Sequence, residues 1–132
     1  MKFDLDKSYE ILERTPVVLK TLLTGLDDAW IRGNEGPETF SPYDVIGHLI
    51  HGEKTGWRAR TNRILEYGVS KTFDSYDRFA QYQESKGKTL RQLLSTWVIH
   101  DLTHMAQITR VMAKQYKGEM GPWVEFFRIM SF

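Results

Sequence analysis

The chain has 132 residues, 41% hydrophobic and 27% charged, with 18 Lys and Arg against 17 Asp and Glu. This predicts one globular domain over residues 1–132, and the near balance of charge gives no case for nucleic-acid binding. Because the chain has no cysteine, disulfides, Cys-ligated metals and a cysteine nucleophile are excluded. The chain has no run of about 18 apolar residues, so no membrane span is predicted. Residues 1–6 lack the apolar core of a secretory signal, and we therefore expect a cytoplasmic protein.

The first segment is predicted to be helical. Pro16 interrupts it and should kink the helix or restart it, with Thr15 as the N-cap and Pro16 as the first helical residue. The polar residues 32–38 then predict a loop. The helical prediction rests on apolar-seam spacing of four and three at Leu5, Tyr9, Leu12, Pro16, Leu19, Leu23 and Leu26.

A second helix is predicted from Pro42 to about Tyr67, before Gly68, with Ser41 as its N-cap. From Val69 to Lys88 the helical pattern is weaker and allows only a short helix. The sequence therefore predicts two long helical segments followed by an abbreviated one.

Thr89 is predicted to be the N-cap of a further long helix, which should end near residues 117–118. A last short apolar helix is expected to begin at Gly121 and to run through Ile129. Alternating strand-like runs are nearly absent, so the fold class is predicted to be all-α, a helical bundle.

His100 and His104 stand four residues apart in this long helix. Their side chains should lie about 40° apart on one face, one turn from each other. They fall on the apolar seam between Trp97 and Val111, where two imidazoles are costly unless their ring nitrogens have partners. A shared metal ion would satisfy them, and two separate hydrogen bonds would do so equally well.

The position of His48 in the second helix favours the shared metal ion, because this side chain could add a third nitrogen ligand from across the bundle. Three histidines leave a position open for water or substrate, as in catalytic zinc sites. His51, one turn away, is an alternative ligand, although we favour a place for it at the rim of the site or behind the ligands. Small residues that let a neighbouring helix approach continue the face of His48: Gly52, Thr55, Gly56 and Ala59.

Glu53 lies on an otherwise apolar stripe, about 140° around the helix from His48. It is a poor candidate for the same metal, and we interpret it as a buried structural hydrogen-bonding group rather than a catalytic base. Trp57 and Trp97 are interpreted mainly as core residues, although either could also line a pocket.

Gln107 lies one turn beyond His104. It could touch a substrate or metal-bound water, or it could be a polar residue packed at the end of the seam. Asp101, beside His100, could orient that ligand or face solvent, and the second arrangement is the more common.

The segments SPYDVIGHLIHGE, LLSTWVIHDLTHMAQITRVMAKQY and GPWVEF resemble the DinB-like superfamily of small helical-bundle metalloproteins. The resemblance covers nearly the whole chain, and its motif is a His early in the second helix followed by HxxxH late in the bundle. It implies an up-down four-helix bundle with His48, His100 and His104 as ligands of one divalent metal ion per chain, commonly zinc or nickel. The third bundle helix is abbreviated here, because the stretch between His48 and His100 is shorter than in most relatives.

Some members of this superfamily are S-transferases or isomerases that use low-molecular-weight bacterial thiols. The resemblance therefore implies a metal-dependent transferase that joins such a thiol to a small electrophile. With no cysteine in the chain, the sulfur must come from a diffusible cosubstrate. A metal-dependent hydrolase is the first alternative, and a non-catalytic, stress-related metal-binding protein is the second.

The sequence also predicts a homodimer, which is frequent in the superfamily. The segment from Val69 to Lys88 is too short to match its neighbours, so part of the apolar seam would be exposed. A twofold dimer would cover it, unless the C-terminal segment folds back into the gap. That segment carries more apolar residues than one short helix buries: Trp123, Phe126, Phe127, Ile129, Met130 and Phe132.

Overall fold

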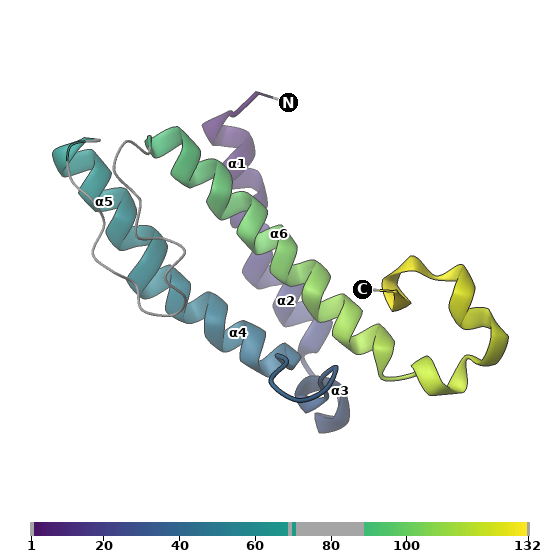
Figure 1. Cartoon of the computed structure of the whole chain (residues 1–132). Helices are drawn as coiled ribbons and strands as arrows, with labels where there is room; N and C mark the ends of the chain where they lie inside the picture. The colour runs from purple at the N-terminus through teal and green to yellow at the C-terminus, as the bar shows by residue number, and fades with distance from the viewer. Residues whose placement is uncertain (1, 69, 71–88, 132) are drawn as a thin grey trace.

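The computed structural model describes residues 2–68, 70 and 89–131, and this part of the chain is helical without strands, as predicted (Figure 1). The predicted short helix between Val69 and Lys88 lies outside the described residues, so a bundle of four helices stays a prediction. The elements are α1 (Leu5–Leu12), α2 (Arg14–Leu23), α3 (Asp28–Arg32), α4 (Pro42–His51), the π-helix η1 (Gly52–Trp57), α5 (Arg58–Tyr67), α6 (Leu90–Lys114) and the 3-10 helices η3 (Lys117–Glu119), η4 (Gly121–Phe126) and η5 (Arg128–Met130).

The first helix is interrupted within one turn of Pro16, as predicted, but the residue that begins the second part differs. The chain leaves α1 after Leu12 and α2 begins at Arg14, with Glu13 between them. The prediction of Thr15 as N-cap is therefore wrong. Pro16 is the third residue of α2, where its missing N–H removes no intrahelical hydrogen bond.

The predicted apolar seam of this first segment is buried only in part. Leu19 is buried in α2, whereas Leu5 and Tyr9 of α1 are exposed. The first turns of the seam therefore lie at the surface of the described chain. A short helix, α3, precedes the predicted loop, which begins at Gly33 rather than Arg32.

Glu35 fastens this loop to α6. Its carboxylate accepts hydrogen bonds of 2.7 to 3.2 Å from the Arg110 guanidinium, and Lys114 Nζ lies 2.7 Å from Oε1. The hydrogen bond from Arg110 is the main cause that lowers the pKa of Glu35. These contacts attach to α6 the loop that leads into α4, the helix that carries His48.

The second long helix begins as predicted. Ser41 and Asp44 form a reciprocal capping box with Pro42 in the first turn. The helix ends at Tyr67, before Gly68 with a φ of 60°. Its middle, however, is the π-helix η1 over Gly52–Trp57, which periodicity did not predict.

The long helix α6 is capped by Thr89 as predicted, in a capping box with Gln92, and it contacts both α1–α2 and α4–α5. Figure 1 shows α4–α5 and α1–α2 running alongside it. Two clusters hold these helices together. One joins Leu19, Val45 and Ile108, and the other joins Trp57, Ile64 and Leu93.

The C-terminal segment is not the single short helix that was predicted. It forms the 3-10 helices η3, η4 and η5, and Figure 1 shows it looping out beyond the end of α6 and returning, so that η5 contacts α6. Met130 is buried, but Trp123, Phe126 and Phe127 are exposed. In the described parts of the chain, every helix is too short or too polar to serve as a membrane span.

Candidate metal centre

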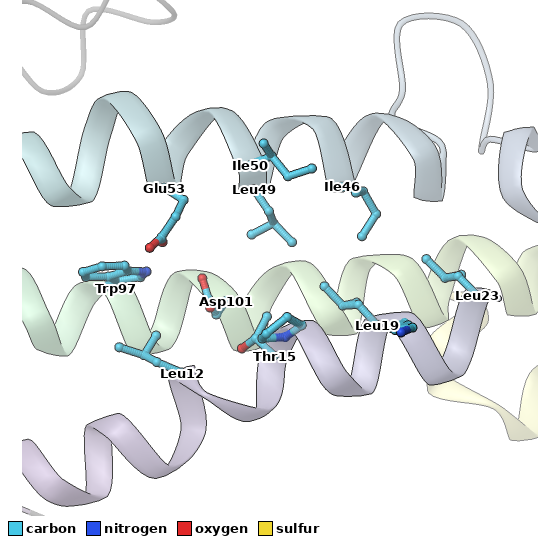
Figure 2. A pocket seen from close by; sticks show the side chains of 12 residues that line it. Leu12, Thr15, Leu19, Leu23, Ile46, Leu49, Ile50, Glu53, Trp97 and Asp101 are labelled. Atoms are coloured by element: carbon cyan, nitrogen blue, oxygen red, sulfur yellow. The ribbon is translucent and has the colours of Figure 1, made fainter.

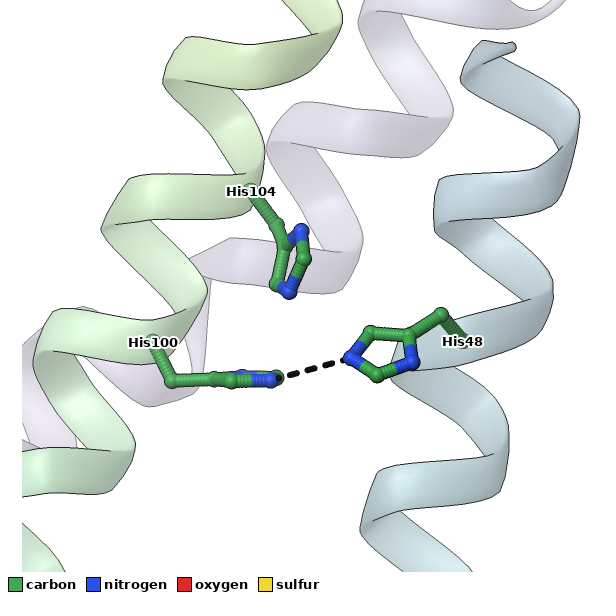
Figure 3. A group of neighbouring side chains, drawn as sticks. All are labelled: His48, His100 and His104. Atoms are coloured by element: carbon green, nitrogen blue, oxygen red, sulfur yellow. Dashed lines mark hydrogen bonds between the residues drawn. The ribbon is translucent and has the colours of Figure 1, made fainter. Parts of the chain in front are cut away.

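Three histidines meet between α4 and α6 (Figure 3). His48 comes from α4, and His100 and His104 come from successive turns of α6. One ring nitrogen from each lies within 4.8 Å of the others, and the Nε2 atoms of His48 and His100 are 3.3 Å apart. All three side chains are half-buried. The residues predicted to share a metal are thus brought together.

A cavity of about 240 Å³ opens beside these rings. Gly52 and Gly56 line it, as expected from the small residues on the face of His48. A Cβ atom added to Gly56 would meet nothing within 4 Å. The two glycines therefore leave room next to the imidazoles for a small molecule.

Gln107 orients one of the rings. Its Oε1 accepts a hydrogen bond of 2.8 Å from Nδ1 of His104. An amide oxygen only accepts, so the proton sits on Nδ1 and the lone pair is left on Nε2. Burial, the main cause, lowers the pKa of His104 and favours this neutral form. This contact with His104 is neither of the two roles predicted for Gln107.

Asp101 is not the solvent-facing residue that was considered more common. Its exposed fraction is 8%, and its Oδ1 lies 3.5 Å from Nδ1 of His100. A carboxylate at Nδ1 favours the tautomer that leaves Nε2 free of a proton. Residues on the outer face of α6 at this point, such as Ile99 and Leu102, are exposed, but Asp101 lies on a face that packs against the neighbouring helices.

Trp57 is both a core residue and part of the site. It is buried, it lines the histidine cavity, and its ring meets that of His100 edge-on at 5.0 Å. It also stacks on Trp97, with ring centres 5.7 Å apart and an interplanar angle of 8°.

His51 and Glu53 are not part of the group. The His51 side chain is exposed, consistent with the predicted place outside the ligands. The predicted buried hydrogen bond of Glu53 is wrong, because among the described residues this exposed carboxylate makes none. Glu53 lines a different cavity, where partial burial and then the charge of Asp101 raise its pKa.

Arg60 is a site residue that the sequence analysis missed. It lines the histidine cavity and is the only Lys or Arg among the residues that the structure places around it. A π-helical turn holds an extra residue and rotates the following side chains about the axis. The spacing of four from His48 through Gly52 and Gly56 to Arg60 was the available signal, but an α-helix would turn Arg60 about 120° away from His48.

The three histidines fit a divalent transition-metal ion. Zn–N bonds are about 2.0–2.1 Å long, so two nitrogens of a tetrahedral site lie about 3.3 Å apart. The observed separation of His48 and His100 is 3.3 Å. Imidazoles without carboxylates suit zinc, nickel, copper or iron rather than magnesium or calcium. The three close residues could therefore hold a metal ion.

Comparison with protein-family models gives no match to this chain, and no curated protein matches it either. The case for a metal centre therefore rests on the geometry of the three histidines and on the residues that orient them.

Proposed function

We propose that this chain is a DinB-like metalloprotein that transfers a low-molecular-weight thiol to a small electrophile. The observation that carries the proposal is the convergence of His48, His100 and His104 beside an open cavity. Three neutral nitrogen donors leave at least one coordination position for a cosubstrate. A bound zinc or nickel ion would supply Lewis acidity, which lowers the pKa of a thiol and favours its nucleophilic thiolate at neutral pH.

The remaining residues bind and orient. Asp101 fixes the tautomer of His100, and Gln107 fixes that of His104. Gly52 and Gly56 leave the space in which the reactants meet. The guanidinium of Arg60 at the cavity suits an anionic group, such as a carboxylate on the thiol or on the electrophile. This placement favours substrates that carry a negative charge.

A hydrolase is less well supported. Water activation in such a site is helped by a nearby general base. Glu53 lines the other cavity, and the Oε1 of Gln107 is engaged by His104. Among the described residues that line the histidine cavity, no carboxylate is present. Thiol activation needs no such base, because a thiol bound to a cation readily loses its proton.

The test compares metal-free protein with protein loaded with zinc or nickel. Each form is mixed with bacillithiol or mycothiol and an electrophile, a chlorinated nitroarene or maleylpyruvate, and loss of both reactants is followed. Loaded protein should consume them and metal-free protein should not. Equal rates for the two forms would refute the proposal. Metal binding without consumption of the thiol and the electrophile, and without hydrolysis of an added ester, would instead favour the non-catalytic alternative.

Two variants separate the roles within the site. His100→Ala should lose both the metal and the activity. Arg60→Gln should keep the metal and raise KM for a carboxylate-bearing substrate about tenfold, the value of one charge-assisted hydrogen bond. His51→Ala is the matched control, because it removes an imidazole from α4, the helix of His48, without touching the group of three.

We also propose that the protein is a homodimer. Trp123, Phe126 and Phe127 are exposed by 67%, 69% and 51%, so the C-terminal segment does not bury its own aromatic residues. Exposed aromatic clusters of this kind usually mark an interface. A twofold partner would bury the same surface of both copies.

A further inference from the structure

A second and larger cavity, of about 570 Å³, lies over α6 between α1–α2 and α4. Its residues differ from those of the histidine cavity. Its volume falls in the range of small-molecule sites, about 300–1,000 Å³. The walls are mainly aliphatic, with Leu12, Leu19 and Leu23 on one side and Ile46, Leu49 and Ile50 on the other.

The two carboxylates of the lining lie at one end. Figure 2 shows Glu53, Trp97 and Asp101 together at that end, and Leu23 and Ile46 toward the other. Glu53 makes no hydrogen bond or ion pair with any described residue. Asp101 has His100 Nδ1 at 3.5 Å. The charge of Asp101 contributes to the raised pKa of Glu53, as expected for two carboxyl groups that share one site.

Among the described residues, no Lys or Arg forms an ion pair with either carboxylate. Lys20 is the only Lys or Arg in the described lining, and it makes no ion pair with either carboxylate among the described residues. Arg58 lowers the pKa of Glu53, but its influence is smaller than those of burial and Asp101. In the described part of the chain, this end of the apolar cavity thus carries two carboxylates without a Lys or Arg partner, and the cation of a ligand would pair with them.

We propose that this cavity binds an amphiphilic organic cation, an ammonium group on an apolar body. The ammonium would lie between the carboxylates of Glu53 and Asp101, where charge-assisted hydrogen bonds are strongest. The indole of Trp97 at the same end suits a cation, because its ring carries negative charge on its faces. The aliphatic walls would take the apolar body.

Calorimetric titration tests the proposal on the whole chain, with n-octylamine as the probe and n-octanol and octanoate as controls of equal length. Octylamine should bind at least about tenfold more tightly than octanol, and octanoate more weakly than both. Equal binding of octylamine and octanol would show that the carboxylates do not recognise the ligand, and would overturn the proposal. Tighter binding of octanoate would also overturn it.

Two variants locate the binding. Glu53→Gln should weaken octylamine about tenfold and leave octanol unchanged, whereas Glu10→Gln, an exposed carboxylate outside the cavity, should change neither. Ile50→Trp places a larger side chain on the cavity wall at a position already 51% exposed, and should abolish binding of all three probes. Unchanged octylamine affinity in both Glu53→Gln and Ile50→Trp would place the ligand elsewhere and overturn the proposal.

The titrations are run on metal-free and on zinc-treated protein. Octylamine should bind the metal-free form, because neither Glu53 nor the aliphatic walls depend on the histidines. Octylamine binding in a protein that takes up no metal would support this inference and remove the proposed function. Metal uptake without octylamine binding would overturn this inference alone.

Discussion

Loss of one histidine should remove the stabilisation that a metal ion confers on the fold. His48 and His100 are 52 residues apart in the chain, so the unfolded chain does not hold the site and the ion binds the folded state. At a free metal concentration of about 100 times Kd, this linkage stabilises the folded state by about 2.7 kcal/mol. For a chain of this size, about 1 kcal/mol shifts Tm by roughly 4 °C. Zinc or nickel should therefore raise the Tm of the unaltered protein by about 10 °C.

The assay combines thermal melting with bound-metal analysis for the unaltered protein and for His100→Ala and His104→Ala. Both variants should bind much less than one ion per chain, and metal should hardly move their Tm. Each shift is taken between the loaded and metal-free forms of the same protein, so a direct effect of the substitution on folding cancels. His51→Ala should keep the full shift. Unchanged stoichiometry in both His100→Ala and His104→Ala would refute the site.

Three further outcomes are expected. Gln107→Leu removes the acceptor that orients His104 and should weaken metal binding about 10- to 100-fold in competition with a chelating indicator; unchanged affinity would contradict that role. Glu35→Gln should lower the free energy of unfolding at neutral pH by about 2 kcal/mol in urea titrations. Because Arg110 and Lys114 lower the pKa of Glu35, this contribution is complete above the unfolded-state pKa and is lost as pH falls through the folded-state pKa, so a difference that persists in acid would count against it. Light scattering at low micromolar concentration should give about twice the 15.5 kDa of one chain, and the mass of a single chain would reject the dimer.

Local chemistry explains why several features could be predicted from sequence. Ser41 and Thr89 cap their helices because a hydroxyl three residues before a free N–H accepts its hydrogen bond whatever the rest of the chain does. His100 and His104 share a face because helical geometry is the same in every fold. These predictions needed no knowledge of which helices pack together.

His48 was a prediction of another kind. The small residues beside it made close approach of α6 possible, but only tertiary packing brings its Nε2 to 3.3 Å from that of His100. Arg60 was missed for a related reason. Its place in the cavity depends on the π-helix η1, and an extra residue in one turn leaves no clear mark in a pattern read at α-helical spacing.

The helical class, the caps of the long helices and the histidine pair of α6 follow from the amino-acid sequence, because each depends on contacts within a few residues. The surroundings of Asp101 and Glu53 depend instead on how the helices pack. Periodicity gives the direction of a side chain around its own helix, but not what lies in that direction. The packing of α1–α2 and α4–α5 against α6 buries Asp101 beside His100 and turns Glu53 toward a separate apolar cavity. Interactions between segments distant in sequence set that packing.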